Sequence, residues 1–253
     1  MIIRPFNSVF FMLMALVAAG TVALSFGFRK KSEKARTILM VSLCAATVVI
    51  FFIYKGFLSV DEEFLVASGI DKFNWWDELP LQLCNINMFL IAIGALTKNK
   101  YLLGFSFYTA PLGAFMALAT PEPTFIGYPL FMPRILGFYV THMMIVMLGI
   151  LIVTLGFYKP SFKSLPGIIA VFLMVAACIH VVNFILRKTV CPFADYFFTF
   201  NPKGVSILEL FWKWIPCPFL YLLPGLGILA VYMVIICTGF WIGRNLRAKK
   251  KEK

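Results

Sequence analysis

Residues 78–87, Glu-Leu-Pro-Leu-Gln-Leu-Cys-Asn-Ile-Asn, open an apolar segment and yet carry a thiol and three amides within six positions. These polar residues are Gln82, Cys84, Asn85 and Asn87. On a helix turning about 100° per residue, the last three would lie roughly 200°, 300° and 140° around from Gln82. Hydrocarbon offers an amide no hydrogen-bonding partner. We therefore predict that other helices or a wet cavity enclose this stretch, and that it forms the wall of the functional site.

The composition of the whole chain is that of a membrane protein. Of its 253 residues, 61% are hydrophobic and 28 are Phe, and the mean hydropathy is +0.91. A soluble domain needs a more polar surface than this composition supplies. Long apolar runs recur without an internal repeat or a soluble domain. We predict an all-α polytopic protein of the cell membrane, with residues 1–253 forming a single helical bundle.

Seven apolar runs are each long enough to cross about 30 Å of hydrocarbon. The predicted spans are residues 8–28, 38–60, 79–97, 101–120, 135–157, 165–186 and 218–243. The first run also resembles a signal peptide, because it contains Ala18-Ala19-Gly20. Its basic cluster, Arg29-Lys30-Lys31, follows the apolar run instead of preceding it, which favours a retained span.

Basic residues alternate between the two sides of the predicted membrane. Residues 29–36, 98–100, 159–163 and 244–253 together carry 15 Lys and Arg against two Glu, whereas the other side has 8 basic and 9 acidic residues. The positive-inside rule then puts the N-terminus outside and the C-terminus in the cytoplasm. The net charge of +12 would suggest nucleic acid in a soluble protein. Here its distribution indicates topology, and we expect no nucleic-acid partner.

The connections predicted on the outer side are long, covering residues 61–78, 121–134 and 187–217. They are rich in aromatic residues and proline, and loops of this length without a helical pattern are often functional. We therefore expect substrates to enter from the outer face. Cys191 and Cys217 bracket the last loop, where an oxidising exterior permits either a disulfide or two free thiols.

Three predicted spans place reactive side chains at a similar depth below the outer surface. Counted along the helices from the flanking charged residues, Cys84, His142 and His180 lie about 9, 12 and 10 Å deep. Asn183, one turn from His180, lies about 6 Å deep. A shared site requires this coincidence of depth.

Such a set of residues supports acyl transfer through a cysteine. Cys84 is the candidate nucleophile, His142 the candidate base, and Asn183 or Gln82 the polar support. The candidate substrate-binding residues are Gln82, Asn87, Tyr139, His180 and Asn183. The chain has no metal, phosphate-loop or serine-hydrolase motif, so we expect no metal and no cofactor.

Each candidate also has a structural explanation. A cysteine in a membrane core is often a small apolar filler, which is our interpretation of Cys44, Cys178 and Cys237. A lone histidine such as His142 often forms a hydrogen bond between helices. For His180 and Asn183, a structural hydrogen-bond network is the favoured interpretation.

Several motifs resemble one family. Leu79-Pro80-Leu81-Gln82-Leu83-Cys84 resembles the Leu-Pro-Leu-His-Leu-Cys signature of the YwaF-like integral membrane proteins, whose animal relative is transmembrane protein one-six-four. Residues 138–142, Phe-Tyr-Val-Thr-His, are similar to the aromatic-to-His element of the family's fifth span. Ala119-Thr120-Pro121 is similar to the end of its fourth span, and residues 201–221 to the Pro-rich segment before its last. The resemblance covers roughly residues 78–223.

The resemblance implies a membrane-embedded acyltransferase acting on phospholipid, an activity of the animal branch, with the motif cysteine as nucleophile. Gln82 stands where the family has His. If that His were the base, His142 would have to serve here, or the site would be inactive.

We therefore predict acyl transfer between membrane lipids, a lysophospholipid and a phospholipid, through Cys84 in an outward-opening cavity. The alternative is a transporter, or a lipid- or small-molecule-binding protein, that uses the same cavity without making bonds. Transport driven by ions or protons usually requires ionisable residues near the midplane. Lys55 is the only Lys, Arg, Asp or Glu in the predicted spans, and it lies close to an outer end. A scaffold role has no distinctive sequence feature.

The charge distribution generates a prediction about topology. Reporter fusions after Lys100 and after Arg247 should both report cytoplasm, and a fusion within residues 187–217 should report the exterior. An external reporter after Lys100 would contradict the count of seven spans.

Overall fold

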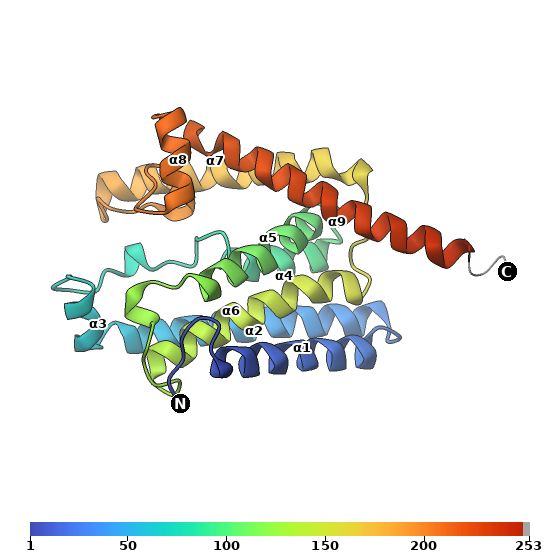
Figure 1. The fold of residues 1–253 in the computed structure, drawn as a ribbon, viewed down its shortest axis with the longest axis horizontal. Helices are drawn as coiled ribbons and strands as arrows, with labels where there is room; N and C mark the ends of the chain where they lie inside the picture. Colours follow the sequence, from blue (N-terminus) through green and yellow to red (C-terminus); the bar gives the residue numbers. More distant parts are fainter. Residues whose placement is uncertain (250–253) are drawn as a thin grey trace. The chain divides into compact units, whose positions relative to one another are not determined.

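The computed structural model describes residues 1–249, and within them it contains helices but no β-strand, apart from an isolated bridge between Ile2 and Pro129. The chain packs into two compact units, Met1–Tyr158 and Lys159–Lys253 (Figure 1). The predicted all-helical polytopic class is confirmed. The single bundle stays a prediction.

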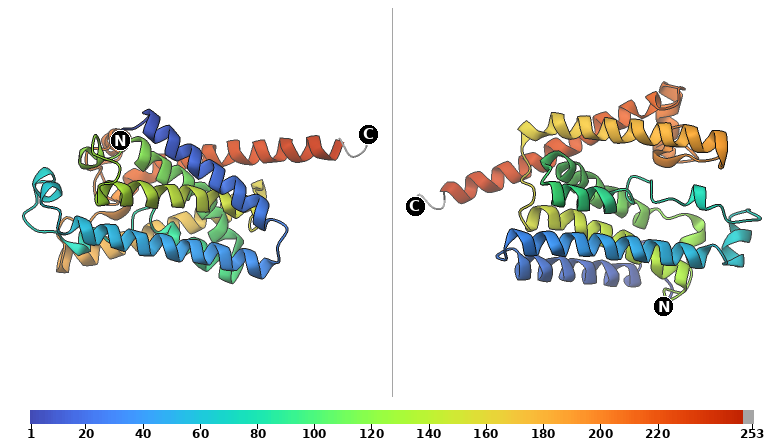
Figure 2. Two further views of the ribbon diagram at one scale, coloured as in Figure 1. Left: turned by 90° about the horizontal axis from the view of Figure 1, so that it is seen from below. Right: turned by 180° about the vertical axis from the view of Figure 1, so that it is seen from behind.

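The first unit is built around one buried helix, α6. Its elements are α1 (Ser8–Phe28), α2 (Glu33–Leu58), α3 (Glu62–Ala67), η1 (Trp75–Asp77), α4 (Asn87–Thr97), α5 (Lys100–Ala119), η2 (Pro123–Phe125) and α6 (Pro133–Thr154). Helix α6 packs against α1, α2, α4 and α5, and most of its side chains are buried. Figure 2 shows α1, α2 and α6 running side by side.

The second unit has two long helices joined by an irregular segment. Its elements are η3 (Phe162–Ser164), α7 (Leu165–Thr189), η4 (Tyr196–Phe198), α8 (Ser206–Trp214), η5 (Leu220–Leu222) and α9 (Leu223–Lys249). Helix α8 is amphipathic, with apolar residues along one face and polar residues along the other, and it packs against η5.

Local sequence explains where the helices of the first unit begin. Asn7 caps α1 by accepting a hydrogen bond from the Phe10 N–H at 2.9 Å, and Asn99 caps α5 in the same way. Pro133 begins α6, where a missing N–H costs no hydrogen bond.

The third predicted span is wrong in its first half. Within residues 1–249, six helical segments are long and apolar enough to cross a membrane. The apolar helix α4 is shorter: it has only 11 residues and begins at Asn87 rather than at residue 79. In a longer helix the Leu83 carbonyl would accept from the backbone N–H of Asn87. Instead it accepts from the Asn87 side-chain amide at 2.7 Å, and the backbone N–H bonds Cys84 at 3.3 Å. The helical positions predicted for Gln82, Cys84 and Asn85 are therefore wrong as well.

Ion pairs show which connections of the first unit lie at the same end. Lys98 pairs with Glu33 at 2.7 Å, which joins the basic segments 29–36 and 98–100. Arg134 and Asp61 pair at 2.8 Å at the other end of α2 and α6. This arrangement agrees with the predicted alternation of charge. Which end faces the cytoplasm stays a prediction.

Small residues allow α6 to approach its neighbours closely. A Cβ added to Gly137 would lie 2.0 Å from the Tyr54 Cβ of α2. A Cβ added to Gly149 would lie 2.5 Å from the Pro111 ring of α5. Both contacts are too close for any side chain, so these glycines set the separation of α6 from α2 and α5.

Replacing Gly137 should therefore destabilise the first unit. We expect Gly137→Ala to cost about 1–3 kcal/mol, because the helices must move apart. Gly20→Ala is the matched control, since no atom lies within 4 Å of its added Cβ, and it should be neutral or stabilise by about 0.5–1 kcal/mol. Unfolding of the purified protein in detergent measures both. Equal stability of the two variants would contradict the close packing of α6 on α2.

Candidate functional site

Cys84 lies in the non-helical segment 79–86, which connects η1 to α4. Its side chain is half-buried. A Cβ added to Gly113 of α5 would lie 3.6 Å from the Cys84 Cβ and 3.7 Å from its backbone N. Helix α5 thus packs directly on the backbone of Cys84, and Gly113 leaves room for it.

His142 of α6 faces the thiol. The distance from the Cys84 Sγ to the His142 Nε2 is 3.6 Å, within hydrogen-bonding range for sulfur. The Nδ1 of the same ring lies 2.8 Å from the Phe138 carbonyl oxygen, which can only accept a hydrogen bond. Nδ1 therefore carries the proton, and the lone pair of Nε2 points to the thiol. This is the tautomer that a base for Cys84 requires.

Aromatic rings hold the imidazole in place. The Phe138 ring centre lies 4.4 Å from that of His142, and Phe125 of η2 stacks on Phe138 at 4.5 Å with an interplanar angle of 21°. His142 is only 5% exposed. The ring is therefore fixed by packing as well as by its hydrogen bond to the backbone.

Asn87, predicted to bind substrate, has structural partners. Its Nδ2 donates to the Leu83 carbonyl at 2.7 Å and to the Thr109 hydroxyl of α5 at 3.2 Å. These bonds fasten segment 79–86 to α5. Gln82 lies in the same segment, half-buried, and its carbonyl accepts from the Ile86 N–H at 2.9 Å.

Three residues close in sequence to Cys84 or His142 each have a buried polar atom with no hydrogen-bond partner among the residues described. These atoms are the Asn85 Oδ1, the Tyr139 hydroxyl and the Thr141 Oγ1. Tyr139 lies one turn before His142 on α6, and the two side chains project from the same face. A buried polar atom without a partner is costly, so such atoms are suited to bind polar groups of a ligand.

A buried ion pair beside this site was missed from the sequence. Lys55 of α2, whose side chain is 10% exposed, pairs with Glu78, immediately before segment 79–86. Its Nζ also lies 5.0 Å from the Tyr54 ring centre. The ion pair thus joins Lys55 of α2 to the start of the segment that carries Cys84. Lys55 was the only Lys, Arg, Asp or Glu in the predicted spans, which was the available signal, but its partner Glu78 lay outside them.

His180 and Asn183 belong to the second unit, so their predicted place beside Cys84 stays a prediction. The Asn183 Nδ2 donates to the Tyr196 carbonyl at 2.8 Å and to the Thr199 hydroxyl at 2.9 Å, and its Oδ1 accepts from the Tyr196 N–H at 2.9 Å. The His180 ring stacks on Phe200 at 4.6 Å. Both contacts fit the favoured interpretation of a structural network, and they leave Asn183 no free N–H.

Asp195 completes that network in the loop after α7. Its carboxylate accepts from the N–H groups of Phe200 and Asn201 at 2.9 and 3.1 Å. Burial raises the pKa of the Asp195 carboxyl, while these hydrogen bonds and the charges of Lys203 and Arg187 oppose the shift. Asp195 therefore closes residues 195–201 into a turn, and Asn183 holds this turn on α7.

The cysteines that bracket this loop are not joined. Cys191 is buried, Cys217 is exposed, and both are thiols in the structure. Across residues 1–249, no three His, Cys, Asp or Glu side chains are grouped so as to hold a metal ion.

The Lys55–Glu78 pair should show strong energetic coupling. In a double-mutant cycle of Lys55→Met and Glu78→Gln, we expect a coupling of about 1–3 kcal/mol, because either single change leaves a charge without its partner. The exposed pair Lys98–Glu33 is the control, and it should show little coupling because water screens it. Denaturant titration in detergent measures both cycles. Equal coupling in the two pairs would show that Lys55 and Glu78 do not hold segment 79–86.

Comparisons with known proteins identify the family. Neither the search of curated proteins nor the search of solved structures found a match. The sequence model of the TMEM164 family matches residues 5–249, nearly the whole chain. The motif around Cys84 resembles the same family. The match to the family model extends well beyond that motif, to nearly the whole chain. The chain belongs to the TMEM164 family of membrane proteins.

Proposed function

We propose that this protein transfers a fatty acyl chain between phospholipids through Cys84. The observation that carries the proposal is the 3.6 Å contact between the Cys84 Sγ and the His142 Nε2, with the opposite ring nitrogen bound to the Phe138 carbonyl. A cysteine that only fills space needs no imidazole oriented in this way. Membership of the family supports the assignment as a membrane protein, whereas the acyl-transfer reaction is our inference.

In the first half of the reaction, the His142 Nε2 takes the proton of the thiol, and the thiolate attacks the ester carbonyl of a phospholipid. A tetrahedral oxyanion forms and collapses. The bond to the glycerol oxygen breaks, and the imidazolium returns its proton to that oxygen. A lysophospholipid leaves, and the acyl chain remains on Cys84 as a thioester.

The second half reverses these steps with another acceptor. The hydroxyl of a second lysophospholipid gives its proton to His142 and attacks the thioester. The thiolate leaves and is reprotonated, so no net proton is consumed. The Tyr139 hydroxyl, one turn from His142, and the Lys55 ammonium are our candidates for stabilising the oxyanions.

The replacement of the family's His by Gln82 makes His142 the sole candidate base in the first unit. An amide does not accept a proton at neutral pH, so Gln82 can only donate or accept hydrogen bonds. His180 lies in the second unit, stacked on Phe200. The activity proposed here therefore depends on one imidazole.

Cys84→Ser tests the nucleophile directly. The change alters the volume little, so the fold should survive, while acyl exchange between labelled lysophospholipid and phospholipid in proteoliposomes should fall by about a thousandfold or more. Cys44→Ser and Cys237→Ser are matched controls, because both thiols are buried within long helices. They should retain near-normal exchange. Full exchange by folded Cys84→Ser protein would rule out the covalent mechanism.

His142→Ala should also reduce exchange strongly, because a thiol with an ordinary pKa of about 8.5 is mostly protonated at neutral pH without a base. A thiol-reactive lipid probe gives a second measurement, and it should label wild-type Cys84 faster than Cys84 in the variant. A wild-type protein that binds lipid or a small molecule but exchanges no acyl chain would favour the alternative of a transporter or binding protein.

A further inference from the structure

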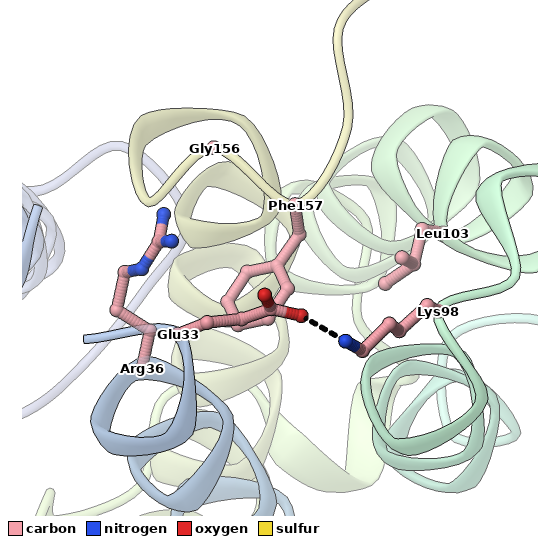
Figure 3. A pocket seen from close by; sticks show the side chains of 6 residues that line it. All are labelled: Glu33, Arg36, Lys98, Leu103, Gly156 and Phe157. Atoms are coloured by element: carbon pink, nitrogen blue, oxygen red, sulfur yellow. Dashed lines mark ion pairs between the residues drawn. The ribbon is translucent and has the colours of Figure 1, made fainter.

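A pocket lies at the end of the first unit where α2 begins and α4 and α6 end. It has a volume of about 250 Å³ and is lined by Glu33, Arg36, Lys98, Leu103, Gly156 and Phe157. Figure 3 shows Arg36 and Lys98 on opposite walls, with Glu33 and the Phe157 ring between them. Along α6, Gly156 of the pocket is 14 residues, or about 21 Å, from His142 of the Cys84 site. It is a separate site.

One wall of the pocket is fixed. The Arg36 Nη1 donates a hydrogen bond to the carbonyl of Leu155, the residue that caps the C-terminus of α6. The Arg36 Nε is buried and has no hydrogen-bond partner within the part of the chain described. Gly156 has φ +83°, and an added Cβ would lie 3.2 Å from the Arg36 Nη1. The glycine therefore permits both the turn after α6 and the position of the guanidinium.

The ion pair on the opposite wall of the pocket can rearrange. Lys98 and Glu33 form an ion pair at 2.7 Å, but their side chains are 71% and 55% exposed. An exposed ion pair contributes little to stability, so the Lys98 ammonium can move to another anion at low cost. Leu103 and Phe157 add apolar surface between the charged groups.

The surrounding charge favours an anion. Residues 29–36 and 98–100, which flank the pocket, contain seven basic residues and one acidic residue, Glu33. Four long helices of this unit also begin or end here, so the pocket lies at the level of lipid headgroups. Basic pockets between membrane helices on the basic side are suited to anionic headgroups.

We propose that this pocket binds the headgroup of an anionic phospholipid. The phosphate lies between Arg36 and Lys98 and takes the place of the Glu33 carboxylate on Lys98. The glycerol and the first methylene groups contact Leu103 and Phe157. The site does not depend on acyl transfer at Cys84, and it would hold a resident lipid that joins the ends of α2, α4 and α6.

Binding can be measured by native mass spectrometry and by thermal unfolding in detergent, with added phosphatidylglycerol or phosphatidylcholine. Wild-type protein should bind phosphatidylglycerol more tightly and gain more thermal stability from it. Lys98→Asn should weaken this binding about tenfold. Asn suits position 98 because the backbone there is left-handed, with φ 56°. Glu33→Gln should tighten binding severalfold, because it removes the competing carboxylate.

Lys30→Asn is the matched control, since it removes the same charge from the basic segment outside the pocket lining. It should change the affinity less than twofold. Equal weakening by Lys30→Asn and Lys98→Asn would overturn the site in favour of a diffuse basic surface. Inorganic phosphate that stabilises the protein as much as phosphatidylglycerol does would overturn the assignment to lipid. All of these measurements are independent of acyl exchange.

Discussion

The first unit depends on how Asn87 uses its side-chain amide. By donating to the Leu83 carbonyl, this amide occupies the acceptor that would otherwise extend α4 toward residue 79. The second N–H of the amide reaches Thr109 on α5. A non-helical segment at membrane depth must have its polar groups satisfied by protein or water. Asn87 does this and also presents Cys84 to α6.

The helices around this segment complete its enclosure. Gly113 of α5 packs on the Cys84 backbone, His142 of α6 contacts the thiol, and Lys55 of α2 pairs with Glu78 at the start of the segment. The close approaches at Gly137 and Gly149 keep α6 in register with α2 and α5. A short irregular segment held by three helices is therefore rigid enough to support a defined contact between thiol and imidazole.

The pairing of Cys84 with His142 was predicted from their similar depths, although the count for Cys84 assumed a helix that the structure does not form at residues 79–86. The start of α4 could not be predicted, because apolar periodicity does not show that an asparagine side chain will compete with the backbone for one carbonyl. The hydrogen bonds of Asn183 agree with the structural interpretation. The partner of Lys55 was missed because Glu78 stands in a connection between spans, where acidic residues are common. The lipid pocket combines residues from four segments and has no local signature.

The shortness of α4 bears on the two leaflets of the bilayer. Its 11 residues rise about 16 Å, roughly half of the hydrocarbon thickness. If Lys98 marks one boundary of the hydrocarbon, Cys84 lies beyond the midplane, on the side of the opposite leaflet. Lipid ester groups lie close to the headgroups, so a thiol on this side of the midplane would be nearer to the esters of one leaflet than to those of the other. Acyl exchange at Cys84 would then alter mainly the chains of the nearer leaflet, and a difference in acyl composition across the membrane would persist until lipids cross it.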